Sequence, residues 1–181
     1  QMASVFATIA NSGQQCKPQS IESVTDRDEN VLKEFAADCK EVISPDLANK
    51  TAALLTASAG QYYTSTRLGD GRPFAAKSGT TDGQTNTWLT GFTPSIVTST
   101  WVGHGENSSQ EVGAVTINGH YYGDIYGETF VGQNIWAPYM TQALAGTPIE
   151  AVSNANIGAT TPQRGATPTP TPSAPPNSND H

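Results

Sequence analysis

Charged residues are scarce in this chain of 181 residues. Asp, Glu, Lys and Arg make up 14% of it, well below the roughly 25% of ordinary globular proteins. The 9 Lys and Arg stand against 16 Asp and Glu, which gives a net charge of −7. Because neutralising phosphates requires clusters of Lys and Arg, this balance excludes a nucleic-acid surface. Long apolar runs are lacking as well, so the sequence predicts neither a membrane-spanning helix nor a signal peptide.

Cysteine is equally scarce, since Cys16 and Cys39 are the only two in the chain. Two thiols are too few ligands for a structural metal site, and the nearest histidine is His104. We therefore expect no metal. Two interpretations of the pair stay open, namely two buried reduced thiols or a disulfide. Their polar neighbours favour the disulfide, which predicts a Cα separation of about 5.5 Å and a location outside the cytoplasm.

Hydrophobic periodicity and turn residues predict an α+β fold, with helices covering an antiparallel sheet. Apolar residues at i, i+3, i+4 and i+7 predict a first helix over residues 1–11. The predicted buried face of this helix consists of Met2, Val5, Phe6 and Ile9.

A second helix is predicted over residues 45–60, after the N-cap residue Ser44. A third is predicted over residues 136–145, where apolar residues again recur at helical spacing. The predicted buried stripe of the second helix consists of Leu47, Thr51, Leu54, Leu55 and Ser58.

Three strands are predicted over residues 74–81, 85–92 and 96–103. The turns between them are short, so consecutive strands must run antiparallel. Apolar pieces on either side of a polar turn also predict a strand–turn–strand unit over residues 21–32. Residues 105–131 are rich in Gly and Tyr and carry no clear period.

The composition changes near residue 148. Residues 160–176 contain Thr-Pro repeats and no aromatic or branched apolar side chain. Such a stretch cannot bury enough surface to offset its ordering entropy. The sequence therefore predicts a folded part over residues 1–147 and a disordered Thr/Pro-rich tail over residues 148–181.

The residues that offer chemistry are Lys77, Ser78, Gly79, Thr80 and Thr81. Strand alternation places Lys77 and Gly79 on one face, and Ser78 and Thr80 on the other. One cation, the hydroxyls and the backbone N–H groups are all donors, and together they suit a carboxylate and a developing oxyanion. Lys-Ser-Gly would occur by chance in about one chain in ten of this length, so the interpretation depends on its surroundings.

The motif stands in an ordered set of segments that covers residues 1 to about 147. These are Gln1-Met2-Ala3-Ser4 through Ala10-Asn11-Ser12-Gly13, Ala75-Ala76-Lys77-Ser78-Gly79-Thr80-Thr81, Trp88, Gly91-Phe92-Thr93-Pro94, Trp101-Val102-Gly103, and Ile135-Trp136 through Leu144-Ala145-Gly146. Taken together, the segments resemble the C-terminal part of the transpeptidase domain of bifunctional, class A penicillin-binding proteins.

The resemblance implies a fold like that of penicillin-binding proteins and serine β-lactamases. It implies a peptidoglycan D,D-transpeptidase that transfers the acyl group of D-Ala-D-Ala stem peptides through a serine acyl-enzyme. In this family Lys77 would hold the substrate carboxylate, and Ser78, Gly79, Thr80 and Thr81 would line the substrate. The hydroxyls of Ser78 and Thr80 would hydrogen-bond the carboxylate, and the backbone N–H of Thr80 would form half of the oxyanion hole.

The family's other two motifs, Ser-x-x-Lys and Ser-x-Asn, are absent from the positions that the family order requires. We therefore expect the nucleophile to lie outside this chain, and the chain alone to be inactive. The resemblance further implies stem peptides as substrates, β-lactams as covalent inhibitors and no cofactor. It places the protein on the extracytoplasmic face of the bacterial membrane, anchored only through the missing N-terminal part.

Two other functions stay open. A hydrolytic relative, a D,D-carboxypeptidase or a β-lactamase-like enzyme, would share Lys-Ser-Gly and would differ in the access of water to the acyl-enzyme. A non-catalytic secreted β-rich module on a Thr-Pro stalk would need no nucleophile at all.

Overall fold

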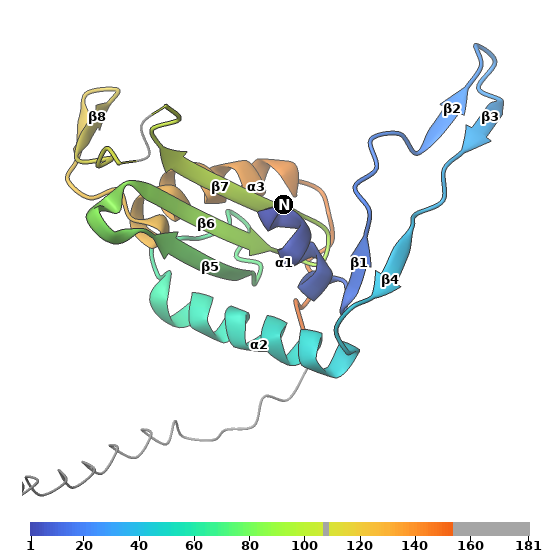
Figure 1. Cartoon of the computed structure of the whole chain (residues 1–181), viewed down its shortest axis with the longest axis horizontal. Helices are drawn as coiled ribbons and strands as arrows, with labels where there is room; N and C mark the ends of the chain where they lie inside the picture. The colour runs from blue at the N-terminus through green and yellow to red at the C-terminus, as the bar shows by residue number, and fades with distance from the viewer. Residues whose placement is uncertain (107–108, 154–181) are drawn as a thin grey trace, which may run out of the picture.

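The computed structural model describes residues 1–106 and 109–153. Figure 1 shows a body of sheet and helices, and an arm that extends away from it. The arm consists of residues 14–42, and the remaining described residues form the body. The elements are helix α1 (Met2–Ala10), strands β1 (Gln14–Cys16), β2 (Ser23–Thr25), β3 (Val31–Glu34) and β4 (Cys39–Glu41), helix α2 (Pro45–Tyr62), strand β5 (Ala75–Thr80), the 3-10 helix η1 (Asp82–Gln84), strands β6 (Asn86–Phe92), β7 (Val97–Gly103), β8 (Val115–Ile117) and β9 (His120–Tyr122), the π-helix η2 (Gly127–Trp136) and helix α3 (Ala137–Ala143).

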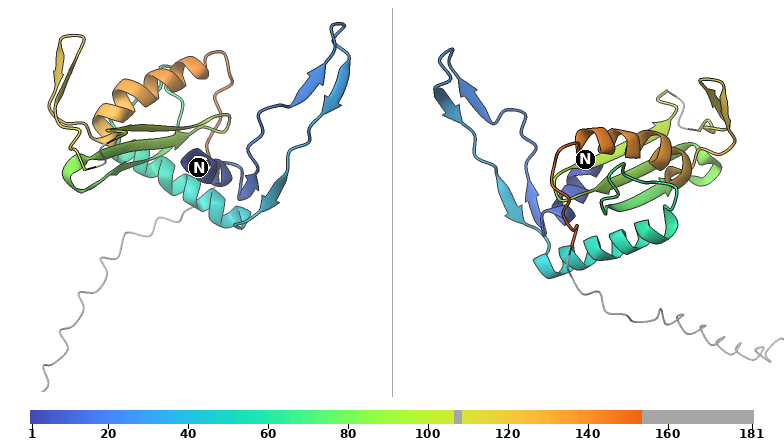
Figure 2. Two further views of the ribbon diagram at one scale, coloured as in Figure 1. Left: turned by 45° about the horizontal axis from the view of Figure 1, so that its top comes forward. Right: turned by 180° about the vertical axis from the view of Figure 1, so that it is seen from behind.

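The centre of the body is a three-stranded antiparallel sheet in the order β5-β6-β7. The three strands predicted from the sequence are confirmed, and β5 lies at an edge of the sheet. Lys77 is paired with Thr90 across the first ladder, and residues paired in this way share one face of a sheet. Helix α1 lies on the front face in Figure 1, and η2 and α3 lie on the back face, which the right-hand view of Figure 2 brings forward.

Helix α1 packs on the front face through its second half. Phe6 meets Phe92 edge to face with ring centroids 6.3 Å apart, and Ile9 belongs to the same cluster. Met2 and Val5 are 46% and 54% exposed, so the predicted buried face is wrong in its first half. Met2 instead lines an open hollow over β5 and β6 together with Phe6.

Helix α2 begins as predicted, because the Ser44 hydroxyl accepts the N–H of Leu47 at 3.4 Å. Its predicted buried stripe is wrong at Leu47 and Leu54, which are 55% and 58% exposed, whereas Leu55 packs against the smaller apolar cluster as predicted. The helix instead buries alanines, whose small side chains allow it to lie close to β5 and α1. The buried residues of the helix are Ala48, Ala52 and Ala59.

The back face carries a continuous helical segment formed by η2 and α3. The predicted third helix agrees with α3, but the ten residues of π-helix before it were not predicted. Trp136 is fully buried where the two helices meet, and its indole N–H donates to the carbonyl of Thr98 on β7 at 3.2 Å. This segment closes the larger of the two apolar clusters of the body.

The arm is a two-stranded ladder with an interruption. Strands β1 and β4 pair at its base and strands β2 and β3 pair near its tip, both antiparallel. The strand–turn–strand unit predicted over residues 21–32 is therefore confirmed, although it is part of a longer hairpin. The arm includes large exposed side chains such as Leu32, which is 66% exposed.

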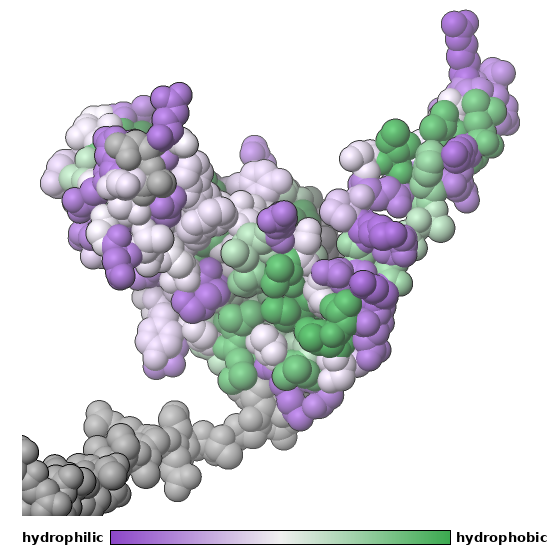
Figure 3. All heavy atoms as spheres, in the orientation of Figure 1, coloured by the Kyte–Doolittle hydropathy of each residue, from purple (hydrophilic) through white to green (hydrophobic). Residues whose placement is uncertain are grey.

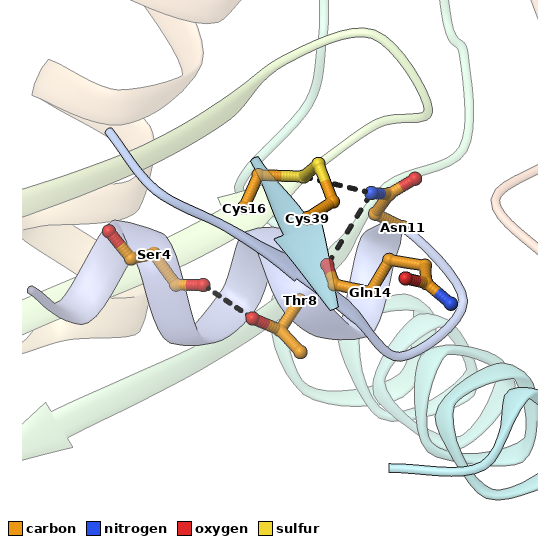
Figure 4. Close-up of a disulfide and its surroundings, with 6 residues drawn as sticks. All are labelled: Ser4, Thr8, Asn11, Gln14, Cys16 and Cys39. Carbon is orange, nitrogen blue, oxygen red and sulfur yellow. Dashed lines mark hydrogen bonds between the residues drawn. A yellow bond between two sulfur atoms is a disulfide. The ribbon is translucent and has the colours of Figure 1, made fainter. Parts of the chain in front are cut away.

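A disulfide joins Cys16 to Cys39 at the base of the arm (Figure 4). The Cα atoms are 3.9 Å apart, which is shorter than the predicted 5.5 Å. The two cysteines lie directly opposite each other in the β1–β4 ladder, and the closer pairs of an antiparallel ladder have Cα atoms only about 4.5 Å apart. The side-chain amide of Asn11, at the end of α1, donates to Cys16 Sγ at 3.6 Å and to the carbonyl of Gln14 at 3.4 Å.

Residues 148–153 contact the body. The carbonyl of Pro148 accepts a hydrogen bond from Arg72 at 3.4 Å, and the Ser153 hydroxyl donates to the carbonyl of Asn49 at 2.9 Å. The rest of the predicted tail, residues 154–181, lies outside the described residues. The boundary predicted at residue 147 therefore stays a prediction. No helix in the described part of the chain has the length and apolar character needed to cross a membrane.

Candidate active site on the edge strand

The candidate site is built on β5, the edge strand of the sheet. Side chains alternate along this strand, so Lys77 and Gly79 face the front with their cross-strand partners Thr90 and Trp88. Ser78 and Thr80 face the back, where η2 and the end of α2 lie. The sheet therefore brings these four of the five predicted residues to one edge but divides them between two faces.

Lys77 borders a hollow of about 220 Å³ on the front face, which Met2 and Phe6 of α1 also line. Its ammonium donates to the carbonyl of Ser78 at 2.8 Å. None of the salt bridges found among the described residues includes this lysine. The cation is thus an exposed donor in otherwise apolar surroundings, free to meet a negatively charged group.

Gly79 lies in the same hollow. A Cβ at this position would meet only the Cβ of Trp88 at 3.7 Å, which is an ordinary van der Waals distance. Packing within the chain therefore does not require a glycine here. The absence of a side chain leaves the front of the strand open beside Lys77.

Ser78 is held from the back by Tyr63, which forms the C-cap of α2. The backbone N–H of Ser78 donates to the phenol oxygen at 2.8 Å, and the phenol hydroxyl donates to Ser78 Oγ at 3.3 Å. The first of these bonds shows that the N–H of Ser78 points away from β6. Because N–H directions alternate along an antiparallel strand, the N–H of Thr80 points to this same outer edge.

The two threonines that follow differ in direction. The hydroxyl of Thr80 lies 3.2 Å from that of Thr87, its cross-strand partner on β6. Thr81 is turned toward the hairpin, where its hydroxyl accepts the N–H of Asn86 at 2.9 Å and lies 2.9 Å from the hydroxyl of Thr85. The predicted contact of Thr81 with substrate stays a prediction.

Two residues beside the motif were not found from the sequence. Tyr63 follows a helix without any motif of its own. Gly127 begins η2, and a Cβ there would lie 2.1 Å from the carbonyl oxygen of Trp88 and 2.9 Å from Ser78 Cβ. The sequence offered one signal for this position, a glycine in a stretch without clear period. That signal is weak, because the sequence contains 17 glycines.

The described residues offer no site for a metal, since no three or more His, Cys, Asp or Glu side chains gather within residues 1–106 and 109–153. The edge of β5 offers hydrogen-bond donors instead. An edge strand presents a cation, hydroxyls and outward N–H groups, which together suit a carboxylate and an oxyanion. The fold and the arrangement on β5 thus agree with the class that the sequence resembles, the penicillin-binding transpeptidases.

Comparison with known proteins agrees with this class. Residues 1–130 match the family model described as the penicillin binding protein transpeptidase domain. The chain belongs to this family. The α+β fold predicted from the sequence, with an antiparallel sheet covered by helices, is that of the family's solved structures.

The chain is similar to two class A relatives named penicillin-binding protein 1A. It is 33% identical to the protein from Mycolicibacterium smegmatis over 157 residues, which cover 83% of this chain and 19% of the relative. It is also 33% identical to the protein from Aquifex aeolicus, over 58% of this chain and 14% of the relative. The chain therefore spans less than a fifth of the length of these relatives.

A solved structure, that of the penicillin-binding protein PonA1 from Mycobacterium tuberculosis, superimposes with a TM-score of 0.68 at 30% identity. The match covers 90% of this chain and 44% of that chain. The similarity thus extends over most of this chain.

Proposed function

We propose that this chain forms the C-terminal part of a serine D,D-transpeptidase domain that cross-links peptidoglycan. In this reaction a serine of the upstream part attacks the carbonyl carbon of a D-Ala-D-Ala stem peptide. The bond to the terminal D-Ala breaks, and that residue leaves with a proton on its amine. An amine of a second stem peptide then attacks the serine ester and takes the acyl group, which restores the serine.

The observation that carries this proposal is the position of the Thr80 N–H on the outer edge of β5, beside the exposed ammonium of Lys77. In the tetrahedral intermediate the carbonyl oxygen becomes negative, and a fixed N–H donor stabilises it. One such donor is typically worth about 3 kcal/mol of barrier, or 10²–10³ in rate. Lys77 attracts the substrate carboxylate, and Ser78 and Thr80 offer hydroxyls to it. The open front of Gly79 allows the substrate to approach the strand.

The exposed apolar surface on the front of the body supports an upstream partner. Figure 3 shows a hydrophobic patch there, over α1 and α2. The apolar side chains of Met2 and Val5 on α1 are exposed, and Met2 also borders the hollow of Lys77. We propose that the upstream part of the domain, which carries the serine, covers this face and closes the hollow over the ammonium.

The remaining parts of the proposal follow from membership of the family. Stem peptides are the substrates, β-lactams acylate the same serine, and the reaction uses no cofactor. The location is the extracytoplasmic face of the bacterial membrane, with the anchor in the upstream part. The disulfide at the base of the arm supports this location, because such bonds persist in oxidising compartments.

The test is the Lys77→Ala variant in the protein that carries this chain together with its upstream part. We expect the second-order rate of acylation by a chromogenic β-lactam, measured by stopped flow, to fall at least about 30-fold. Leaving one partner of a buried charge pair unmatched typically costs 2–5 kcal/mol. Lys50→Ala is the matched control, because Lys50 lies on the surface of α2 in an exposed pair with Asp46, and such pairs contribute little.

Acylation of Lys77→Ala within threefold of the parent, at an unchanged melting temperature, would show that Lys77 is an ordinary surface residue. If the acyl-enzyme forms but is rapidly hydrolysed by water, the D,D-carboxypeptidase or β-lactamase-like alternative replaces transpeptidation. If fluorescent penicillin does not label the longer protein, the non-catalytic alternative holds. The 181-residue chain alone should form no covalent adduct, and mass spectrometry after incubation with a β-lactam checks this.

A further inference from the structure

Tyr63 lies against the motif without belonging to it. Its side chain is 4% exposed and packs in the larger apolar cluster of the body. Its hydroxyl reaches the edge strand at Ser78, where it contacts two polar groups. These are the backbone N–H, at 2.8 Å, and Oγ, at 3.3 Å.

The two hydrogen bonds fix the direction of the protons. A phenol hydroxyl has a single proton and also accepts. Its oxygen accepts the N–H of Ser78, and its own proton is directed to Ser78 Oγ. Ser78 Oγ then serves as an acceptor toward Tyr63, and the proton of the serine hydroxyl remains for a different acceptor. A carboxylate is an acceptor only, and it suits this remaining proton.

Ser78 is also confined by η2. Gly127 approaches so closely that a Cβ there would lie 2.9 Å from Ser78 Cβ. The serine side chain is thus packed by η2 and hydrogen-bonded by the end of α2. Both contacts come from elements that are far from β5 in the sequence.

We infer that Tyr63 is a positioning residue, which holds Ser78 as a hydrogen-bond donor toward the carboxylate of the substrate. Tyr63 touches no reacting atom and acts through Ser78 alone. The inference rests on the proposed function, because it assigns the carboxylate to Ser78. It concerns binding of the carboxylate more than formation of the oxyanion, since the N–H of Thr80 is two residues further along the edge.

The test uses Tyr63→Phe in the protein that includes the upstream part, because this change removes one oxygen and keeps the ring. We expect the β-lactam concentration at half-maximal acylation to rise about tenfold, the size of one net hydrogen bond, with the limiting acylation rate changed less than threefold. Tyr62→Phe is the matched control. Tyr62 is the preceding residue and is 66% exposed, so we expect changes within twofold.

Double variants separate positioning from support of the fold. If Tyr63 acts through Ser78, adding Tyr63→Phe to Ser78→Ala causes no further loss of affinity. An equal tenfold loss in both backgrounds overturns the inference, and so does a half-maximal concentration within twofold of the parent for Tyr63→Phe alone. The acylation rate of Lys77→Ala tests the proposed function separately. If Lys77→Ala is impaired while Tyr63→Phe is not, the inference alone fails.

A second substitution keeps the inference testable if Tyr63→Phe does not fold. Ser78→Ala removes the hydroxyl to which Tyr63 donates and leaves the ring of Tyr63 in place. We expect the half-maximal β-lactam concentration to rise about tenfold in this variant. A value within twofold of the parent would overturn the inference, because Ser78 would then have no contact with the carboxylate for Tyr63 to support.

Discussion

The body and the arm are stabilised by different interactions. The body buries large apolar side chains completely, including Leu89, Phe92 and Trp136. The arm, all of whose residues are described, contains no buried residue at all. Its shape depends on backbone ladders, on one disulfide, and on local contacts such as Lys33 above the ring of Phe35 at 4.5 Å.

This difference indicates which changes spread through the molecule. Buried residues of the body pack in clusters that include residues of the motif strand, so a change at such a residue should affect the whole fold. A residue in the arm has few neighbours to disturb, and its loss should remain local. The base of the arm is the exception, because it joins the two regions.

The largest effect is expected for Gly127→Ala in the body. The added Cβ would lie 2.1 Å from a backbone oxygen of β6, which no side-chain rotation can relieve. We expect the free energy of unfolding to fall by about 3–4 kcal/mol, at or above the upper end of the usual range for overpacking. Chemical denaturation of the variant and its parent measures this difference.

Gly60→Ala is the matched control for the same substitution. Gly60 lies in α2, and a Cβ there would meet nothing within 4 Å. Alanine is the better helix former, so this variant should gain up to about 1 kcal/mol. Similar losses in both variants would contradict the importance of close packing between η2 and the sheet.

The next effect is expected at the base of the arm. Val42 donates its N–H to the carbonyl of Gly13 at 3.0 Å, so the body holds the two ends of the arm together in the native state. The disulfide between Cys16 and Cys39 therefore acts mainly by restricting the unfolded chain. Replacing both cysteines by serine should lower the free energy of unfolding by about 3 kcal/mol, with an unchanged near-UV spectrum from the tryptophans of the body.

Thiol titration of the unfolded, non-reduced protein provides the control and should detect no free thiol. Two free thiols would rule out the bridge. If the doubly substituted protein is as stable as its parent, then the ends of the arm separate freely in the native state, and the arm is independent of the body down to its base.

The parts of the fold that were predicted correctly depend on local signals. Ser44 and the proline after it define the start of α2, and short turns at residues 82–84 and 93–95 define the antiparallel strands. The buried stripe of α2 could not be predicted, because close approach to a sheet favours alanine over the more hydrophobic Leu47 and Leu54. The hairpin of β8 and β9 was missed although Asn118 and Gly119 are typical of its turn, and both have positive φ.

The candidate site was likewise predicted only where the signal was local. The alternation of Lys77 and Ser78 follows from strand geometry alone, and their importance follows from the resemblance. Tyr63 and Gly127 lie 15 and 49 residues from Ser78 in the sequence, and only tertiary packing brings them to it. A π-helix has no sequence period that a helical or strand pattern would reveal, so the segment that covers the back of the motif could not be predicted.

The smallest effect compares two carboxylates, one in each region. The guanidinium of Arg72, which is 6% exposed, donates to Asp70 and thereby lowers the pKa of that carboxyl below its ordinary value of 3.8. Asn30 donates to Asp26 at the turn of the arm and lowers the pKa of Asp26 in the same way. A lowered pKa contributes stability above the ordinary value, and this contribution is lost as the pH falls through the lowered pKa.

Asp70→Asn should therefore lower the melting temperature at pH 7 by no more than a few degrees, and the difference from the parent should shrink as the pH falls below about 4. Asp26→Asn should have a smaller effect on global unfolding, because the turn at the tip of the arm can open while the body stays folded. The comparison requires thermal melts of the three proteins between pH 3 and pH 7. If Asp26→Asn lowers the melting temperature as much as Asp70→Asn does, the arm unfolds together with the body. Its contacts must then be counted as part of one cooperative unit with the sheet that carries Lys77.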